Sequence, residues 1–279
     1  MKLAIVVPVL NEFDLADTAI DLMSAYLVPY ENKNWTTEII AIDNGSAKPF
    51  KRESIHCVYL KKNIGVYPIF WEALKHTDAD ILAFFHSDLI LAEPNWGKRV
   101  LEEFAKRPKL GLLGFVGSNE IDNDGGRGHG TTSNFQGNES MRQNADGTKT
   151  VWKGSPAGMH GRCSDGYSQA AVVDGCAMIF RKEVLEKIKQ RENFPPHHFY
   201  DRLLSCETRE IGYEIGVLGI ACDHISGQTV GANPDYGKEW CEAHNLSMIE
   251  TWDKTVYLEA ERQWLTEYRD VKKLIPCKV

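Results

Sequence analysis

The sequence lacks the common signatures of a phosphate-binding loop and of a metal-binding cysteine cluster. No Gly-x-Gly-x-x-Gly fingerprint and no Walker pattern occurs in the 279 residues, which argues against a Rossmann dehydrogenase. The seven cysteines are odd in number and form no Cys-x-x-Cys pair. This usage is typical of a reduced, cytosolic protein and argues against a zinc site or a disulfide framework.

Long apolar runs and an excess of positive charge are also absent. No stretch approaches the ~20 apolar residues that cross a bilayer. The chain opens directly into the apolar segment Leu3–Val7, which is too short for a signal peptide. We therefore expect no transmembrane segment and a cytoplasmic location. The formal net charge of -7 argues against broad electrostatic binding to nucleic acid or to an anionic membrane.

Short apolar runs alternate with helical spacings, which predicts an α/β fold with a mostly parallel sheet flanked by helices. Residues 1–230 are predicted to form this domain. Within it, residues 118–169 are rich in glycine and poor in aliphatic side chains, so we expect a loop-rich insert that acts as a lid. Residues 235–270 read as helical. We therefore expect 231–279 to be a helical C-terminal extension packed on the domain.

Polar residues follow two of the predicted strands. Ile81–Phe85 reads as a buried central strand that delivers His86, Ser87 and Asp88 to its carboxyl end, where open parallel sheets bind ligands. A carboxylate there can hold a divalent cation, which in turn can hold a diphosphate. The alternative is that Asp88 caps the following turn. Asp43, after another strand, either accepts hydrogen bonds from a nucleoside or belongs to a plain Asp-Asn-Gly-Ser turn.

Three further positions have both a functional and a structural interpretation. Gly65 would let the backbone approach a phosphate or a base, although one glycine is a weak signal. Asp201 lies at the start of a predicted helix, where an N-cap is the default interpretation. His224 follows a predicted strand, and a lone histidine is more often a satisfied loop residue than a ligand.

Taken together, these segments resemble the GT-A-fold glycosyltransferases of family 2, an inverting, nucleotide-sugar-dependent group, over roughly residues 1–230. The similar segments are Ile5-Val6-Val7-Pro8-Val9-Leu10-Asn11-Glu12 (first strand and nucleotide-binding turn), Asp43-Asn44-Gly45-Ser46 (second nucleotide contact), Asn63-Ile64-Gly65 (Asn-x-Gly), His86-Ser87-Asp88 (Asp-x-Asp), Val173-Asp174-Gly175 (sugar pocket), His198-Phe199-Tyr200-Asp201 (Glu-Asp) and His224. Each motif is short, but their order and spacing over most of the chain carry the resemblance.

The resemblance implies a GT-A (Rossmann-like) fold and transfer of a hexose from a nucleotide sugar, with UDP as the default, to an acceptor hydroxyl. It implies Asp201 as the catalytic base, and Asp88 and His224 as ligands of Mn²⁺, with Mg²⁺ as the alternative. The nucleotide-sugar-binding residues that it implies are Pro8, Leu10, Glu12, Asp43, Asn63, Gly65, His86, Ser87, Asp174 and Gly175. A saccharide is the expected acceptor, with protein or modified nucleic acid as alternatives.

Two positions depart from the family pattern. His86 replaces the first aspartate of Asp-x-Asp, and Leu203 stands where a second acidic residue often follows the Tyr-Asp pair. These departures keep open the alternative of a nucleotide-sugar-binding module that has lost catalysis. A nucleotidyltransferase is a further alternative, but it normally has a glycine- and basic-rich loop after the first strand, which Pro8–Glu12 lacks.

Overall fold

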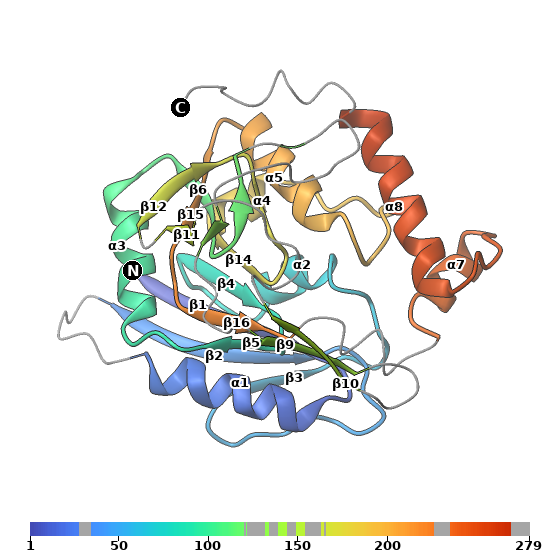
Figure 1. Cartoon of the computed structure of the whole chain (residues 1–279), viewed down its shortest axis with the longest axis horizontal. Coiled ribbons are helices and arrows are strands. Elements are labelled where there is room, and N and C mark those ends of the chain that lie inside the picture. Colours follow the sequence, from blue (N-terminus) through green and yellow to red (C-terminus); the bar gives the residue numbers. More distant parts are fainter. Residues whose placement is uncertain are drawn as a thin grey trace.

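An eight-stranded sheet forms the middle layer of the protein (Figure 1). The structure, a computed structural model, describes residues 1–27, 35–119, 121, 132–133, 139–143, 149–153, 163–164, 166–225 and 235–268. The strands of this sheet are β1 (Lys2–Val9), β2 (Thr36–Asp43), β3 (His56–Tyr59), β4 (Ile81–Phe85), β6 (Leu110–Gly114), β12 (Tyr167–Ala170), β14 (Ala177–Arg181) and β15 (Glu214–Leu218).

Most pairings in this sheet are parallel. The strand order is β12-β15-β6-β14-β4-β1-β2-β3. The neighbours from β4 to β3 are parallel, as are β6 and β15. Only β14, which runs against β4 and β6, and β12, which runs against β15, are antiparallel in this sheet. The prediction of a mostly parallel α/β sheet is therefore confirmed.

Helices cover both faces of the sheet because its central strands are apolar on both sides. In β1, Leu3 and Ile5 enter one core cluster, whereas Ala4 and Val6 enter the other. The helices α1 (Phe13–Ala25) and α3 (Trp96–Lys106) cover the first cluster. The helices α2 (Ile69–Leu74), α4 (Lys182–Lys187), α5 (Tyr200–Glu210) and α8 (Trp252–Tyr268) cover the second.

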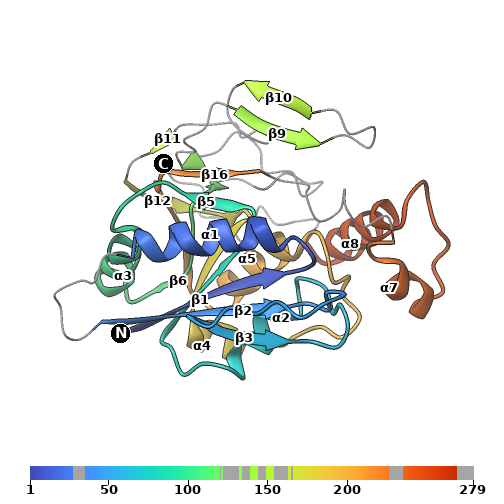
Figure 2. The ribbon, with the colours of Figure 1, turned by 90° about the horizontal axis from the view of Figure 1, so that it is seen from below.

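Four two-stranded ladders lie outside the main sheet. Two of them pin loops to the domain: β5 (Leu89–Leu91) pairs with β16 (Cys222–His224), and β7 (Gly117–Ser118) pairs with β13 (Val172–Val173). The others are β8 (Thr132–Ser133) with β11 (Cys163–Ser164) and β9 (Glu139–Gln143) with β10 (Lys149–Lys153). Figure 2 shows β9 and β10 beyond β5 and β16, away from the main sheet. Most of the predicted lid, 118–169, lies outside the described residues, so its role stays a prediction.

The described part of the C-terminal segment contains two helices, which confirms the expected helical tail, and an interruption between them that was not predicted. The helix α7 (Lys238–Ala243) ends before Asn245, whose φ of 56° is left-handed, and α8 begins at Trp252. Asparagine tolerates this conformation better than most residues do. One face of α8 enters the core through Ala260, Trp264 and Tyr268. The boundary near residue 230 between a domain and an extension stays a prediction.

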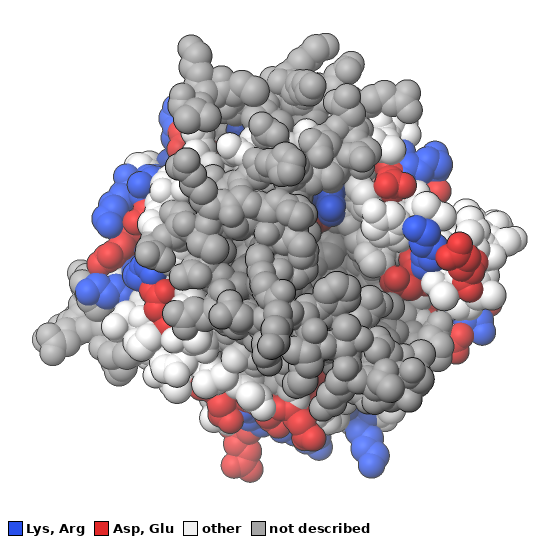
Figure 3. All heavy atoms as spheres, viewed as in Figure 1, with Lys and Arg blue, Asp and Glu red and all other residues white. Residues whose placement is uncertain are grey.

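The described surface has neither a membrane-spanning helix nor a one-sided charge pattern on the face drawn in Figure 3. Among the helices that the structure describes, none is both long enough and apolar enough to cross a bilayer. On that face, basic and acidic side chains of the described residues lie intermixed around the margin.

Candidate active site

A cleft of about 270 Å³ opens where β1 and β4 end and α5 begins. Its lining includes nine of the residues that the sequence predicted for the site: Pro8, Leu10, His86, Ser87, Asp88, Asp174, Gly175, Asp201 and His224. The cleft is also lined by polar and aromatic residues that were not predicted as site residues, although three of them stand in quoted motifs: Asn44, His197, His198, Tyr200, Arg202, Tyr236 and Tyr257. The structure thus gathers segments that are far apart in the chain into one place.

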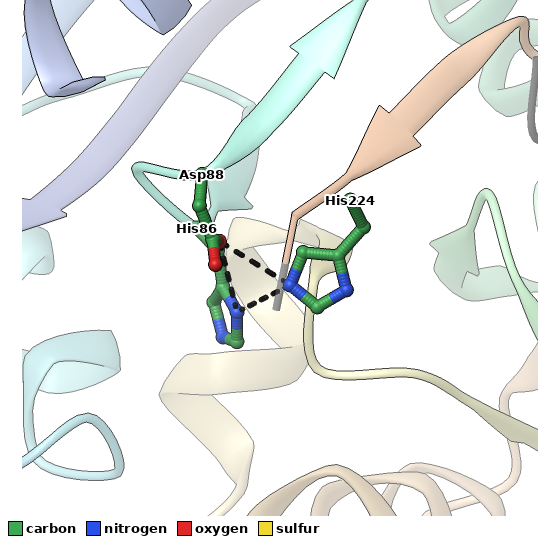
Figure 4. A group of neighbouring side chains, drawn as sticks. All are labelled: His86, Asp88 and His224. Carbon is green, nitrogen blue, oxygen red and sulfur yellow. Dashed lines mark hydrogen bonds and ion pairs between the residues drawn. The ribbon is translucent and has the colours of Figure 1, made fainter. Parts of the chain in front are cut away.

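Three of these side chains converge at one end of the cleft, which we call the inner corner: His86, Asp88 and His224 (Figure 4). The Nε2 atom of His224 lies 3.2 Å from Oδ1 of Asp88 and 3.4 Å from Nδ1 of His86. The Nδ1 atom of His86 lies 3.8 Å from the same carboxylate oxygen. Two imidazole nitrogens and one carboxylate oxygen therefore face a common point.

The backbone explains why these side chains meet. Residues 86–88 follow β4 directly, and β5 continues from them. In the antiparallel pairing of β5 with β16, His224 stands opposite Leu89, next to Asp88. The backbone N–H of Ile225 also donates a hydrogen bond to the carbonyl oxygen of Asp88, at 3.1 Å. A short ladder therefore fixes His224 beside the end of the central strand.

The electrostatics of the inner corner favour a neutral histidine beside a charged carboxylate. Burial lowers the pKa of His86 to about 4, and the nearby Asp88 only partly opposes this shift. Burial alone would raise the pKa of Asp88, but its hydrogen bond to His224 and the two imidazoles hold that pKa below its usual value. At neutral pH, His86 therefore carries a free lone pair and Asp88 carries a negative charge, as metal ligands require.

The hydroxyl of Tyr200 supports the inner corner from behind. Its Oη lies 2.8 Å from Nε2 of His86, on the ring edge away from Asp88 and His224. Gly175 fits closely against the same hydroxyl, because a Cβ atom there would lie 2.3 Å from Oη. The only sequence signal for Tyr200 was its place in the Tyr-Asp pair, where the family pattern has glutamate.

Asp201 lines the same cleft as the second residue of α5 and is 7% exposed. Its Oδ1 accepts hydrogen bonds from the backbone N–H of Arg202 at 2.9 Å and from Nη1 of Arg202 at 3.1 Å. The N-cap of α5 is Phe199, without a side-chain cap, so the N-cap interpretation of Asp201 was wrong.

The residues just before Asp201 adopt an unusual backbone conformation. His198 and Phe199 have φ values of 61° and 52°, in the left-handed region. Such a conformation costs about 1–3 kcal/mol for each residue other than glycine, and it persists only where surrounding contacts impose it. Here Tyr257 packs edge-on against both rings, with ring centroids 5.4 Å away in each case. The chain is thus held in a strained turn at the edge of the cleft.

A second cavity of about 910 Å³ lies next to the cleft and shares Leu10, His197 and Tyr236 with it. The predicted residues Asn63 and Gly65 line this second cavity and not the cleft. The shared wall is polar, because Oη of Tyr236 lies 2.6 Å from Nδ1 of His197. The shared wall therefore separates Asn63 and Gly65, two predicted nucleotide contacts, from the cleft that contains the inner corner.

Two predicted binding residues line neither cavity. Asp43 is buried, and its carboxylate accepts hydrogen bonds from the backbone N–H groups of Ser46, at 2.9 Å, and Phe50, at 2.7 Å. Its neighbour Asn44 lines the cleft instead. Glu12 lies at the N-cap of α1 and makes no side-chain cap hydrogen bond there. The predicted nucleotide contacts of Asp43 and Glu12 stay predictions.

Comparison with known families decides what kind of protein carries this cleft. Residues 69–268 match the sequence profile of the Glycosyltransferase like family. The chain belongs to this glycosyltransferase family. The match covers the inner corner, α5 and most of the C-terminal segment. None of the curated proteins with which the chain was compared matches it.

Solved structures of other glycosyltransferases share the GT-A fold of this family member. A mannosyltransferase from Pyrobaculum calidifontis, solved with GDP-Man and Mn²⁺, is 12% identical, has a TM-score of 0.51, and matches 98% of this chain and 72% of its own. GalNAc-T7, solved with UDP, GalNAc and Mn²⁺, is 10% identical, has a TM-score of 0.54, and matches 99% of this chain and 58% of its own. At such low identity these likenesses establish the fold alone.

Proposed function

We propose that the protein is a metal-dependent, inverting glycosyltransferase that transfers a hexose from a nucleotide sugar, with UDP as the first candidate nucleotide, to an acceptor hydroxyl. The observation that carries this proposal is the convergence of His86, Asp88 and His224 in the cleft that also holds Asp201. Family membership supports sugar transfer. The mannosyltransferase and GalNAc-T7, which were solved with nucleotides and Mn²⁺, support the nucleotide-sugar donor and the metal.

The donor set of the inner corner fits one divalent cation. Such ions bind nitrogen and oxygen ligands at about 2.1 Å, which sets neighbouring ligand atoms roughly 3.0 to 3.4 Å apart. The three separations observed, 3.2, 3.4 and 3.8 Å, are close to this range. Two imidazoles suit Mn²⁺ better than Mg²⁺, which prefers oxygen ligands and retains water. When bound, the cation supplies a Lewis acid that neutralises the leaving diphosphate.

Tyr200 would fix His86 in the form that binds metal. A histidine that ligates through Nδ1 must carry its proton on Nε2, and that N–H needs an acceptor. The Oη atom of Tyr200, 2.8 Å away, can accept this hydrogen bond. We therefore assign His86 as a third ligand beside Asp88 and His224, in addition to its predicted place at the nucleotide sugar.

Asp201 would act as the general base. In a single displacement, the acceptor oxygen forms a bond to the anomeric carbon, the bond from that carbon to the diphosphate oxygen breaks, and the hydroxyl proton passes to the Asp201 carboxylate. One displacement inverts the anomeric centre without a covalent enzyme intermediate. Asp174, whose Oδ1 accepts a hydrogen bond from the backbone N–H of Cys176 at 2.9 Å, lines the same cleft and would contact the sugar.

The proposal also includes the class of the acceptor and the cellular location. A saccharide is the proposed acceptor, since cleft-lining aromatic and polar side chains such as Tyr257 and Arg202 suit a hydroxylated ring. The five described cysteines that are free thiols fit the proposed cytoplasmic location, where thiols stay reduced.

A thermal-shift screen of UDP and GDP sugars, with Mn²⁺, Mg²⁺ or EDTA, tests the donor and the metal together. A ligand at about 100 times its Kd stabilises the folded protein by about 2.7 kcal/mol. We expect stabilisation by a UDP sugar with Mn²⁺, less with Mg²⁺, and none for Asp88→Ala. The control Asp78→Ala removes an exposed carboxylate that lines neither cavity and should behave as wild type. Equal stabilisation in EDTA would contradict metal dependence.

A further inference from the structure

One histidine of the cleft lining, His198, pairs with an aspartate of the C-terminal helix α8, Asp253. We call this pair and its aromatic neighbour, His198, Asp253 and Tyr257, the outer rim. The Nε2 atom of His198 lies 2.6 Å from Oδ1 of Asp253, in the first turn of α8. Both His198 and Tyr257 line the cleft.

The pairing determines which ring nitrogen of His198 can meet a ligand. With its proton on Nε2, the neutral imidazole donates to Asp253 and keeps a lone pair on Nδ1. Among the described residues, Nδ1 has no hydrogen-bond partner. The strained turn at His198 and Phe199 places this imidazole at the cleft, three residues before Asp201. A substrate that receives the sugar near Asp201 would therefore also lie near Nδ1 of His198, which can accept a hydrogen bond.

We propose that His198, held by Asp253, accepts a hydrogen bond from a hydroxyl of the acceptor and that Tyr257 contacts a face of the acceptor's ring. The acceptor class is a hydroxylated ring compound, a saccharide. The inference rests on the proposed function and adds to it that α8 supplies part of the substrate site. Asp253 and Tyr257, both on α8, are the residues that do so. Asp253 is a positioning residue, because it acts on the substrate only through His198.

Two replacements of His198 separate a substrate contact from a mere structural latch. Glutamine places its amide near the position of Nε2, so His198→Gln keeps a partner for Asp253 and loses the group at Nδ1. Asparagine places its amide near the position of Nδ1, so His198→Asn keeps a polar group for the substrate and loses the contact with Asp253. Asp253→Asn keeps the shape of the pair but no longer fixes the tautomer of the imidazole.

The experiment measures transfer from UDP-glucose with Mn²⁺ to a panel of methyl glycosides, together with the Tm of each variant. For His198→Gln, we expect the KM for the glycoside to rise about three- to tenfold, as for loss of one hydrogen bond, with a less than twofold change in the KM for donor. His198→Asn should show a smaller rise in the glycoside KM despite a lower Tm, and Asp253→Asn an intermediate one. The control His76→Gln alters another histidine–carboxylate pair, with Glu72, that lines neither cavity, and both KM values should stay unchanged.

Two outcomes would overturn the inference. If His198→Gln keeps the wild-type KM and Tm while His198→Asn does not, the pair of His198 and Asp253 has a structural role only. If wild type transfers glucose to water but neither binds nor uses any methyl glycoside, the acceptor class is wrong. Failure of the proposed function looks different, because wild-type protein would then show no Mn²⁺-dependent binding of UDP.

Discussion

The two ends of the cleft are built in different ways. At the inner corner, His86 and Asp88 follow a buried central strand, and the β5–β16 ladder carries His224 to them. At the outer rim, a strained turn pairs through side chains with a helix more than fifty residues further along the chain, and no backbone hydrogen bond joins the two among the described residues. Backbone pairing tolerates most substitutions, whereas side-chain pairing depends on a few residues. We infer that the proposed metal and diphosphate site is the constant part of this cleft and that the proposed acceptor site is the adaptable part.

Asp201 lines the cleft and is the proposed general base, so its loss should have the largest effect. We expect Asp201→Asn to lower the transfer rate by about 10²- to 10⁴-fold, the usual contribution of a general base, with little change in nucleotide binding. Initial rates and a Mn²⁺–UDP titration would measure both quantities. Asp78→Asn is the control, because Asp78 is exposed and pairs with Lys2 far from the cleft. Near-normal turnover by Asp201→Asn would remove this residue from the mechanism.

Loss of the Tyr200 hydroxyl, which contacts the inner corner, should have a smaller effect than loss of Asp201. Tyr200→Phe removes the acceptor of the His86 Nε2–H and keeps the ring, so it should weaken Mn²⁺ binding about 10- to 100-fold, as is typical when the partner of a ligating histidine is lost. Isothermal titration with Mn²⁺, without donor or acceptor, measures this directly. The control Tyr213→Phe removes a hydroxyl bonded to Lys187 outside both cavities. Unchanged affinity in Tyr200→Phe would contradict the proposed role of this hydroxyl in orienting His86.

The link that Arg191 makes between α5 and α8 should respond to pH. Glu207 on α5 contacts Nε of Arg191 at 2.7 Å, and Arg191 also pairs with Glu267 on α8. Burial raises the pKa of Glu207 to about 7, although Arg191 opposes the shift, and its Oε2 has no hydrogen-bond partner among the described residues.

Because this pKa is higher in the folded than in the unfolded state, Glu207 favours folding below about pH 4.5 and loses that contribution as pH rises through about 7. We therefore expect the free energy of unfolding of Glu207→Gln to fall less than that of wild type between pH 5 and 8, by roughly 2 to 3 kcal/mol at most. Urea denaturation at several pH values measures the difference. Glu186→Gln, which removes an exposed pairing with Lys182, should parallel wild type. Parallel curves for Glu207→Gln would contradict the raised pKa.

The fold could be predicted wherever burial is regular. The runs at Leu3–Val7 and Ile81–Phe85 are buried on both faces, so apolar composition alone revealed the central strands. Strands of three residues such as β5 and β16 carry no such signal, and they form only because tertiary contacts bring them together. The break between α7 and α8 escaped prediction for a similar reason, since the left-handed Asn245 lies inside an otherwise helical pattern.

The candidate site could be predicted where a short motif holds its residues and not where distant segments combine. Asp88, Asp201 and His224 came from motif resemblance, and the structure brings all three to one cleft. Their mutual distances depend on the β5–β16 ladder, which no motif encodes. The pairing of His198 with Asp253 joins residues 55 positions apart, so neither residue carried a sequence signal for it.

The ladder of β7 with β13 has a consequence for how such a protein can diversify. Ser118 pairs with Val172, and the backbone N–H of Ala171 donates to the carbonyl oxygen of Ser118 at 2.7 Å. The chain therefore leaves the body of the domain after β7 and returns to it at the short strand β12, which directly precedes β13. The cost of closing a loop grows slowly with its length, so we expect changes in length between residues 119 and 166 to leave the pairing of β7 with β13 intact.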